Sequence, residues 1–347
     1  MTSLTNSALV SLTLLVGCGR YAQLIEPGPT DDDSVPGDAA PPEVCSGRAV
    51  SLAAAGVAMC AARDDGRVLC WGDGDSGHLS PASFRSLANP VLLPELEDVA
   101  RVLGSDSLFC AVFRAPGKQA QCWGVLRFTD REGRSMLRDQ PLPLGLAGGD
   151  LALGAGICAL SAGTLTCWGG PFWDPLPLAT DVVQVFWDSE QSVVALSREG
   201  VWTRFGGPAP ETLTGFPEAV AAVSARASRW ALLLPTGEVA LPNGGGHPET
   251  VSAFGTDNAA VEVGPGGQVC VVKASGGVIC SKEVRPSAPA EVPGVSAAAL
   301  ALGWNDCALD RAGRVWCWAG LDLQGSEESA EVSFMDLATP TAPNLCP

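Results

Sequence analysis

Residues Cys307–Trp318 read CALDRAGRVWCW, and versions of this stretch recur along the chain from Cys60 onward. A short strand, CAL, enters the turn DRAG, and a second strand, RVWCW, leaves it. Small, β-branched and aromatic residues favour strands, and the Gly allows the positive φ that a tight hairpin turn needs. The stretch therefore predicts a β-hairpin with one Cys on each arm.

Seven glycines occupy the turn position of this hairpin, at intervals of 37 to 51 residues. They are Gly66, Gly117, Gly163, Gly200, Gly237, Gly276 and Gly313. Each hairpin follows a small or apolar segment, and several are followed by an extended segment marked by Pro. Four short strands per unit at this spacing are typical of a propeller blade. Seven such units predict an all-β, seven-bladed β-propeller over residues 45–346.

The cysteines form local couples around these turns. Their spacing and the expected antiparallel register predict five hairpin disulfides: Cys60–Cys70, Cys110–Cys122, Cys158–Cys167, Cys270–Cys280 and Cys307–Cys317. In the fourth unit the two Cys positions hold Val194 and Arg204, and in the fifth they hold Trp230 and Leu241. In each of these units both cysteines of the pair are absent, which is expected if the two cysteines form a disulfide in the other units.

Two further cysteines, Cys45 and Cys346, flank the seven units. We expect them to bond to each other, because closing a propeller ring brings the two ends of the repeat region together. Zinc ligation is the alternative use of these cysteines, but the chain has no Cys-x-x-Cys and only two His. We therefore expect no metal and no cofactor.

The N-terminal 18 residues have the pattern of an export signal. An apolar run from Ala8 to Val16 is too short to span a bilayer comfortably and ends in the residues LVGC, numbers 15–18. This ending resembles the lipobox of bacterial lipoproteins, which implies cleavage before Cys18 and diacylation of that Cys. An ordinary secretory signal is the alternative. Residues 19–44 are rich in Pro, Asp and small residues, and they predict a disordered tether.

The repeat unit itself resembles a known family. The first unit reads AAGVAMCAARDDGRVLCWGDGDSGHLS over residues 54–80. It is similar to the RCC1 repeat (regulator of chromosome condensation), with matches that include Cys60, Gly66, Trp71 and Gly77. The Asn and Gln of the family pattern are replaced by Gly74 and His78. The resemblance implies a seven-bladed propeller, in agreement with the glycine count.

The tryptophans fall into two groups. Trp71, Trp123, Trp168 and Trp318 directly follow the second hairpin Cys, where the repeat uses a large ring to fill space between blades. A second group, Trp173, Trp187, Trp202 and Trp230, lies in units three to five, where disulfides and repeat regularity are lost. These four residues either mark a binding face or repack blades that lack a disulfide.

The composition limits the function. A net charge of −17 and a pI near 4.4 argue against nucleic acid and against direct adhesion to anionic membranes. No P-loop, G-x-S-x-G, H-E-x-x-H or Rossmann fingerprint occurs, so we identify no catalytic residue.

We therefore expect an exported, lipid-anchored, monomeric propeller that binds an unidentified envelope or extracellular protein without catalysing a reaction. Its only membrane contact would be the lipid on Cys18, which places it at the outer membrane or cell surface. Without the lipid it would be periplasmic or secreted. The alternatives are a structural envelope component and a lyase or glycosidase with a site in the central channel. Carboxylates of raised pKa near the propeller axis would favour the enzyme, and an aromatic patch on one face would favour the binding protein.

Overall fold

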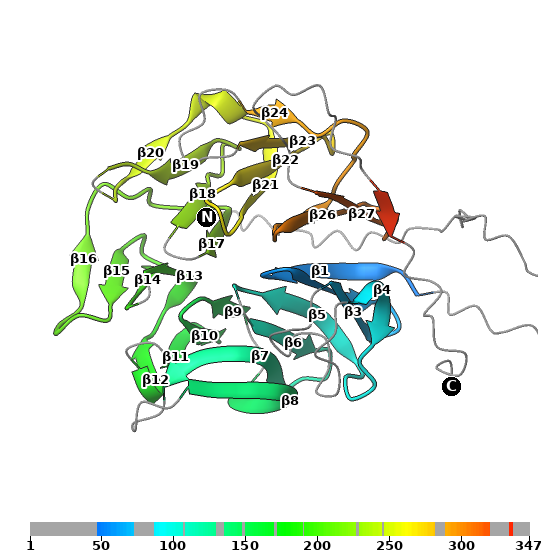
Figure 1. Cartoon of the computed structure of the whole chain (residues 1–347). Coiled ribbons are helices and arrows are strands. Elements are labelled where there is room, and N and C mark those ends of the chain that lie inside the picture. The colour runs from blue at the N-terminus through cyan, green and yellow to red at the C-terminus, as the bar shows by residue number, and fades with distance from the viewer. Residues whose placement is uncertain are drawn as a thin grey trace, which may run out of the picture.

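The computed structural model describes residues 47–72, 87–106, 108–129, 135–147, 150–169, 172–189, 191–226, 229–244, 246–281, 289–319 and 333–335. These residues form seven antiparallel sheets of four strands each, arranged around a common centre (Figure 1). The prediction of an all-β, seven-bladed propeller is confirmed. The expected signal peptide (1–18), the tether (19–44) and the outer limits of the propeller lie outside the described residues.

Each blade consists of four strands that are consecutive in the sequence. Blades one to four contain β1 (Ala49–Ala55), β2 (Ala58–Arg63), β3 (Val68–Gly72), β4 (Leu87–Leu92), β5 (Val99–Gly104), β6 (Leu108–Phe113), β7 (Gln119–Thr129), β8 (Ser135–Ala147), β9 (Asp150–Leu153), β10 (Gly156–Ser161), β11 (Thr164–Gly169), β12 (Phe172–Ala179), β13 (Val182–Ser189), β14 (Ser192–Ser197), β15 (Trp202–Phe205) and β16 (Glu211–Leu213). Blades five to seven contain β17 (Ala222–Arg226), β18 (Arg229–Leu233), β19 (Val239–Pro242), β20 (Pro248–Thr250), β21 (Asn258–Val263), β22 (Val269–Lys273), β23 (Val278–Ser281), β24 (Ala290–Glu291), β25 (Ala299–Ala301), β26 (Asn305–Leu309), β27 (Val315–Ala319) and β28 (Ser333–Met335). A 3₁₀ turn, η1 (Ser252–Phe254), lies between β20 and β21.

The first strand of each blade lies near the centre of the ring, and the fourth strands, such as β8, β16 and β24, lie at the rim (Figure 1). Neighbouring first strands contact one another around the whole ring, including β25 against β1. Because the strands alternate in direction, the turns between first and second strands share one end of the propeller. We call this end the inner-turn face. The opposite end carries the turns between second and third strands and is called the hairpin-turn face.

The hairpins have the predicted register. Cys60 pairs with Cys70, and Ala61 pairs with Leu69. All five predicted hairpin disulfides are present, and the Cα atoms within each pair lie 4.0 to 4.1 Å apart. Such short separations suit the directly opposed, non-hydrogen-bonded positions of an antiparallel ladder. The expected disulfide between Cys45 and Cys346 lies outside the described residues.

Each disulfide packs against an aromatic ring of the next blade. The Cys60–Cys70 bond of blade one lies in one apolar cluster with Trp123 of blade two. The Cys270–Cys280 bond of blade six shares a cluster with Trp318 of blade seven. Cys and Trp are adjacent in sequence and therefore point to opposite faces of their sheet. The pattern Cys-Trp thus gives blades one, two, three and seven a disulfide on one side of the sheet and a ring on the other.

Blade four lacks the disulfide, and aromatic rings fill its boundary with blade five. Val194 occupies the first Cys position and pairs with Arg204, as predicted. Phe186, Trp202 and Trp230 pack with it in one cluster, and the Phe186 and Trp230 ring centroids lie 5.6 Å apart. Burying large rings supplies apolar area that partly replaces the missing cross-link.

One detail of the predicted fifth unit is wrong. The β18–β19 ladder pairs Leu232 with Ala240, so Leu241 continues opposite Ala231 and not opposite Trp230. Ala231 and Leu241 are both buried and hold the positions of the missing cysteines. Trp230 lies one residue earlier and therefore points toward blade four.

All seven turn glycines adopt positive φ, between 77° and 99°. At Gly66, Gly163, Gly237 and Gly313 the carbonyl oxygen accepts a hydrogen bond from the first residue of the first strand of the next blade, and at Gly276 it accepts one from Ala297, just before β25. Gly66 O accepts from Val99 N at 2.8 Å, and Gly313 O accepts from Ala49 N at 3.2 Å. The second bond crosses the boundary between blade seven and blade one. The turn glycines therefore shape the hairpin and also join neighbouring blades.

Candidate functional site

One arginine reaches across the centre of the ring on the inner-turn face. Arg226 ends β17 in blade five, and its side chain is only 5% exposed. Its Nε donates to Asp106 Oδ1 at 2.9 Å, and its Nη2 donates to the carbonyl oxygens of Ala54 and Ser105 at 3.3 and 3.2 Å. Its Nη1 donates to the carbonyl oxygen of Leu302. A single guanidinium thereby connects blade five to blades one, two and seven.

The other blades leave room for this side chain. Arg226 pairs with Arg229, and the residues in the corresponding place in blades one, two and four are small: Ala55, Ser105 and Ser189. Four of the five guanidinium N–H groups have acceptors, and the Asp106 carboxylate balances the charge. The arrangement accounts for the burial of an arginine at the centre of the ring.

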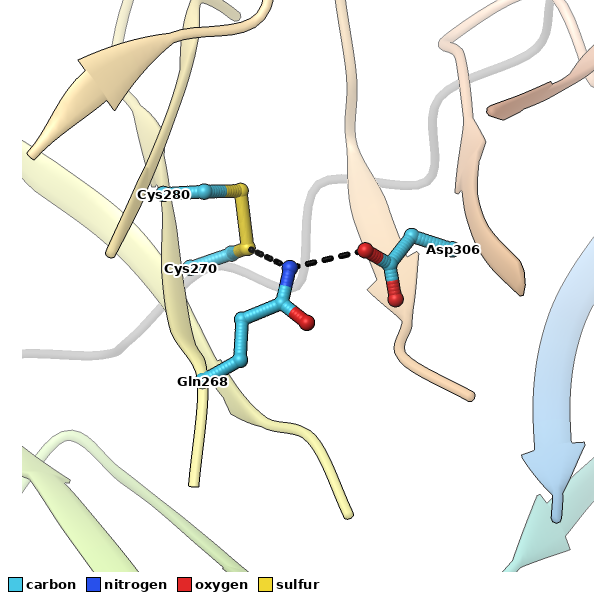
Figure 2. The surroundings of a disulfide bond; sticks show 4 residues. All are labelled: Gln268, Cys270, Cys280 and Asp306. Atoms are coloured by element: carbon cyan, nitrogen blue, oxygen red, sulfur yellow. Dashed lines mark hydrogen bonds between the residues drawn. A yellow bond between two sulfur atoms is a disulfide. The ribbon is translucent and has the colours of Figure 1, made fainter. Parts of the chain in front are cut away.

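Two carboxylates from blades six and seven lie near Arg226. Glu262, on β21, accepts a hydrogen bond from Ser224 Oγ at 3.1 Å. Asp306, on β26, accepts one from Gln268 Nε2 at 2.7 Å. Figure 2 shows that Gln268 lies between Asp306 and the disulfide of blade six, and its Nε2 is also 3.5 Å from Cys270 Sγ. Gln268 therefore connects β26 of blade seven to blade six.

Both carboxyl groups have raised pKa values. Burial raises the pKa of Glu262 to about 7, although the charge of Arg226 and the hydrogen bond from Ser224 act in the opposite direction. Burial likewise raises the pKa of Asp306 to about 6, against the hydrogen bond from Gln268 and the field of Arg226. Arg226 is already paired with Asp106, so it compensates the two buried carboxylates incompletely. Both groups change charge near neutral pH.

Trp304 is the exposed aromatic residue of this face. It follows β25 in the first turn of blade seven, its side chain is 70% exposed, and its backbone N donates to the carbonyl oxygen of Gly56 at 3.0 Å. A Cβ atom placed on Gly56 would lie 3.1 Å from the carbonyl oxygen of Asp106, so the first turns of blades seven, one and two adjoin. Among the described residues, the other exposed large hydrophobic side chains are valines. An indole held at the surface by a backbone bond is suited to contact a partner.

Three tryptophans of the predicted binding group are in the core. Trp187, Trp202 and Trp230 are at most 5% exposed. Trp187 packs on the disulfide of blade three, and its Nε1 donates to the carbonyl oxygen of Ala152. Their burial agrees with the repacking interpretation and places no indole of these three on a face. Trp173 belongs to β12, and its side chain lies outside the description.

The tryptophans predicted to fill space between blades do so. Trp71, Trp123 and Trp318 are at most 4% exposed, and Trp168 packs against the cluster that contains the disulfide of blade two. Cys18, Cys45 and Cys346 lie outside the described residues. Within the described ranges, no group of three or more His, Cys, Asp and Glu could hold a metal ion.

The described part of the chain contains no helix long and apolar enough to cross a membrane.

Sequence reasoning did not identify Arg226, Glu262, Asp306 or Trp304. Two weak signals were present. Arg226 stands where the first unit has the small Ala55, and Trp304 lies in a first turn that elsewhere contains small or polar residues. Neither signal shows that the residues come from three different blades to one end of the ring, because that proximity arises only when the ring closes.

The described chain is thus a seven-bladed propeller in which five blades carry a hairpin disulfide and an arginine bridges the centre. Its fold is that of RCC1-type propellers, as the repeat motif implied. Yeast RCC1 (Prp20), solved bound to Kap60, has a TM-score of 0.59 and 15% sequence identity over 73% of this chain and 77% of its own. Human WBSCR16 has a TM-score of 0.57 and 15% identity over 74% of this chain and 86% of its own.

A third similar structure is the CRINKLY WD40 ectodomain of the Arabidopsis thaliana receptor kinase ACR4. It has a TM-score of 0.53 and 18% identity, and the match covers 79% of this chain and 99% of that ectodomain. No protein-family model matches the chain, and no curated protein matches its sequence. At these identities the likeness establishes the fold.

Proposed function

We propose that this chain is an exported, lipid-anchored, non-enzymatic module that binds another protein at the cell envelope through its inner-turn face. The observation that carries the proposal is Trp304, a 70% exposed indole held by a backbone hydrogen bond between blades seven and one. Large rings that are already fixed in place contribute strongly to protein interfaces, because little conformational entropy is lost on binding. The yeast structure with Kap60 is one case in which an RCC1-type propeller is bound to another protein.

The hairpin-turn face is less suited to a partner. Five of its turn glycines accept hydrogen bonds from the next blade, as in the bonds from Val99 N to Gly66 O and from Val182 N to Gly163 O. These tight turns leave little backbone free for a partner. The inner-turn face, in contrast, presents Trp304 beside Asp106, whose side chain is 41% exposed. The contrast between the two ends favours the inner-turn face.

The proposed location is supported by chemistry in two parts of the chain. Five disulfides in the described residues are typical of exported proteins, because cytosolic thiols are kept reduced. The lipobox at residues 15–18 supplies a route to export and anchoring. Two or more acyl chains on Cys18 would give stable attachment, and the residues 19–44 would serve as a spacer. The partner is then a protein of the envelope or the extracellular space.

The binding surface can be tested by placing a photo-reactive amino acid at position 304 of the full-length chain in cells that export it. We expect a discrete cross-linked protein at position 304 and none at position 201. Val201 is a matched control because it is 42% exposed and adjoins the hairpin-turn face. Excess wild-type protein should compete for the cross-link, and Trp304→Ala should compete poorly. Equal cross-linking at both positions, or equal competition by the variant, contradicts the proposal.

The anchor can be tested separately by intact mass and detergent partitioning of the exported chain. We expect residues 1–17 to be absent, Cys18 to carry lipid, and the protein to enter the detergent phase. Cys18→Ser should abolish the partitioning. An exported protein with an unmodified Cys18, or with residues 1–17 still attached, contradicts lipid anchoring and leaves the binding surface untouched.

An enzyme with its site near the propeller axis is the second candidate function. Glu262 and Asp306 favour it, since carboxyl groups of raised pKa near the axis are the feature expected of such a site. Their neighbours weigh against it, because Arg226 bridges the same region and four of its five N–H groups already donate to protein acceptors. Screening the wild type and Glu262→Gln against polysaccharide substrates distinguishes the enzyme from the binding protein. Turnover by the wild type that is lost in Glu262→Gln would establish the enzyme.

A further inference from the structure

The first turns of blades seven, one and two meet at glycines on the inner-turn face. A Cβ atom placed on Gly303 would lie 2.8 Å from the carbonyl oxygen of Gly56, and one placed on Gly56 would lie 3.1 Å from that of Asp106. Without side chains at these points, the three backbones approach closely. Trp304 follows Gly303 and donates its backbone N–H to the carbonyl oxygen of Gly56. The turns that carry Trp304 and Asp106 therefore both contact Gly56, which places the two residues beside each other on this face.

The side chains of Trp304 and Asp106 both reach solvent. Trp304 is 70% exposed, and the side chain of Asp106 is 41% exposed. Arg226 donates to Asp106 Oδ1 at 2.9 Å from the interior, since the arginine side chain itself is only 5% exposed. The Asp106 carboxylate therefore has a donor on its inner side and water on its outer side. A partner that covers Trp304 also covers this carboxylate.

Positive charge is scarce at this point of the ring. Arg226 is the cation whose field acts on Glu262 and on Asp306. It is also the ion-pair partner of Asp106, so three carboxyl groups share one guanidinium. Asp306 Oδ1 is buried and accepts no hydrogen bond from the described residues. The region therefore has more negative than positive charge when these carboxyl groups are ionised.

The neighbouring sequence does not make up this deficit. The first turns of blades seven, one and two, residues 302–304, 56–57 and 105–107, contain no Lys or Arg. Arg229 pairs with Arg226 in the β17–β18 ladder, but its guanidinium donates to the carbonyl oxygen of Gly266 in blade six. The surface beside the exposed indole is therefore acidic.

These features define the chemistry of a partner that covers Trp304. An anionic surface would be repelled by the carboxylates. An apolar surface would contact the indole but would remove Asp106 from water without supplying a new donor, which is costly. An Arg or Lys side chain satisfies both groups, because a cation binds to the face of an indole and also pairs with a carboxylate. Charge complementarity therefore favours a basic partner.

We propose that the first turns of blades seven, one and two form a binding site for an Arg or Lys side chain on a surface loop of the partner protein. The cationic group lies on the indole face of Trp304 and pairs with the carboxylate of Asp106. Glu262 and Asp306 add negative charge from deeper in the ring and do not contact the partner. This inference rests on the proposed function, since it concerns the same surface, and it adds the chemistry of the partner.

The test uses a blocked tripeptide, acetyl-Gly-Arg-Gly-amide, and its counterpart with citrulline in place of Arg. Citrulline has nearly the same shape as Arg but no charge. Binding to the full-length chain in detergent is measured by saturation-transfer NMR on the peptide signals, at low ionic strength and at pH 8, where Glu262 and Asp306 are mostly ionised. We expect saturable binding of the Arg peptide that weakens as salt is added. The citrulline peptide should bind about fivefold more weakly or less tightly still.

Two variants locate the site. Trp304→Leu keeps an apolar side chain but removes the indole face, so we expect it to bind the Arg peptide about two- to fivefold more weakly. Asp106→Asn keeps an oxygen that accepts from Arg226 but removes the charge, and it should also weaken binding. Glu199→Gln is the matched control, because it removes one exposed carboxylate from the hairpin-turn face and should leave binding unchanged. Thermal melting checks the fold of each variant, and Trp304→Leu decides alone if Asp106→Asn does not fold.

Three results would overturn the inference. They are equal binding of the Arg and citrulline peptides, no binding of the Arg peptide up to its solubility limit, and equal binding of the Arg peptide by wild type and Trp304→Leu. The proposed function fails in a different way. Cross-linking at position 304 without selective binding of the Arg peptide refutes the partner chemistry alone. Selective binding of the Arg peptide without a cross-linked protein in cells refutes the protein-binding function and leaves the cation site standing.

Discussion

Arg226 shows how one side chain can join blades that are far apart in the ring. Its acceptors lie in blades one, two and seven, and three of them are the backbone carbonyls of Ala54, Ser105 and Leu302. Hydrogen bonds from a charged donor are stronger than neutral ones, and buried acceptors that lose their donor destabilise the fold. Arg226 therefore contributes to stability through several blades at once.

Replacement of Arg226 by Leu should strongly destabilise the protein. We expect a loss of about 3–5 kcal/mol, because the acceptors become unsatisfied and Asp106 loses its partner. Arg226→Lys should lie between wild type and Arg226→Leu, since one ammonium cannot reach all four acceptors. Urea unfolding monitored by circular dichroism measures the difference. Arg198→Leu, at an exposed turn, serves as control and should change stability by less than about 0.5 kcal/mol. Equal effects of the Arg226 and Arg198 variants would contradict the bridging role.

The turn glycines provide a second prediction for single residues. Gly237 and Gly117 have nearly the same φ, 80° and 79°, but different surroundings. A Cβ atom on Gly237 would lie 2.0 Å from the carbonyl oxygen of Thr256, whereas a Cβ on Gly117 meets nothing within 4 Å. Gly117→Ala should cost about 1 kcal/mol for the left-handed backbone, and Gly237→Ala should cost clearly more because blade six must move. Thermal melting of the two variants makes the comparison, and an equal fall in Tm would show that the contact between blades is unimportant.

At the scale of elements, the hairpin was predictable and its surroundings were not. Gly66 and the Cys60–Cys70 spacing set the register because a tight turn with Gly at positive φ fixes which residues face each other. The same local logic located all five disulfides. In blade five it assigned the first Cys position to Trp230 and not to Ala231, because this blade has no Cys that fixes the register in the sequence. Contacts of Arg226 and the exposure of Trp304 depend on blades more than 70 residues apart in sequence, which no local pattern encodes.

The disulfide of blade six should matter more when it is half removed than when it is removed entirely. Cys270→Ser leaves Cys280 as a buried, unpaired thiol, and in the oxidising compartment that we propose for this chain the thiol can form wrong disulfides during folding. The double variant Cys270→Ser, Cys280→Ser resembles the hairpin of blade four, which folds without a cross-link. We expect a higher secreted yield from the double variant. A yield of the single variant equal to or above that of the double would count against this view of the pair.

For the whole molecule, the buried carboxyls predict how stability depends on pH. Burial sets the folded pKa of Glu262 at about 7 and that of Asp306 at about 6, above their ordinary values of 4.5 and 3.8. Their stabilising effect is complete below the ordinary values and is lost as the pH rises through 6 to 7. Asp310 acts in the opposite sense: despite partial burial, its pKa is lowered by backbone and side-chain hydrogen bonds from Arg314, so its contribution is lost in acid.

Stability should therefore be greatest near pH 5 and should decrease toward pH 8, by on the order of a few kcal/mol. Unfolding in urea at several pH values measures this dependence. The double variant Glu262→Gln, Asp306→Asn should have a flatter profile on the alkaline side. A stability that rises from pH 5 to pH 8 would mean that both carboxylates are well compensated when ionised.

The bond expected between Cys45 and Cys346 also concerns the whole molecule. It would close a loop of 301 residues, which the chain-entropy model values at about 5–6 kcal/mol, against roughly 3 kcal/mol for each small hairpin loop. We expect reduction of this bond to lower stability more than loss of a single hairpin disulfide. Peptide mapping without reduction identifies the partner of Cys45. Any partner other than Cys346 would disprove ring closure by this bond.

The hydrogen bond from Ala49 N to Gly313 O means that the fold does not require the chain to begin at blade one. Blade seven meets blade one through the same kind of contact that joins other neighbouring blades, and each described blade draws all four strands from one continuous stretch. No described strand is shared across that boundary. A circularly permuted chain that begins at blade five and ends with blade four would keep every sheet intact. An array of this kind can also grow by duplication of single blades, because each new blade brings its own strands and its own glycine contact.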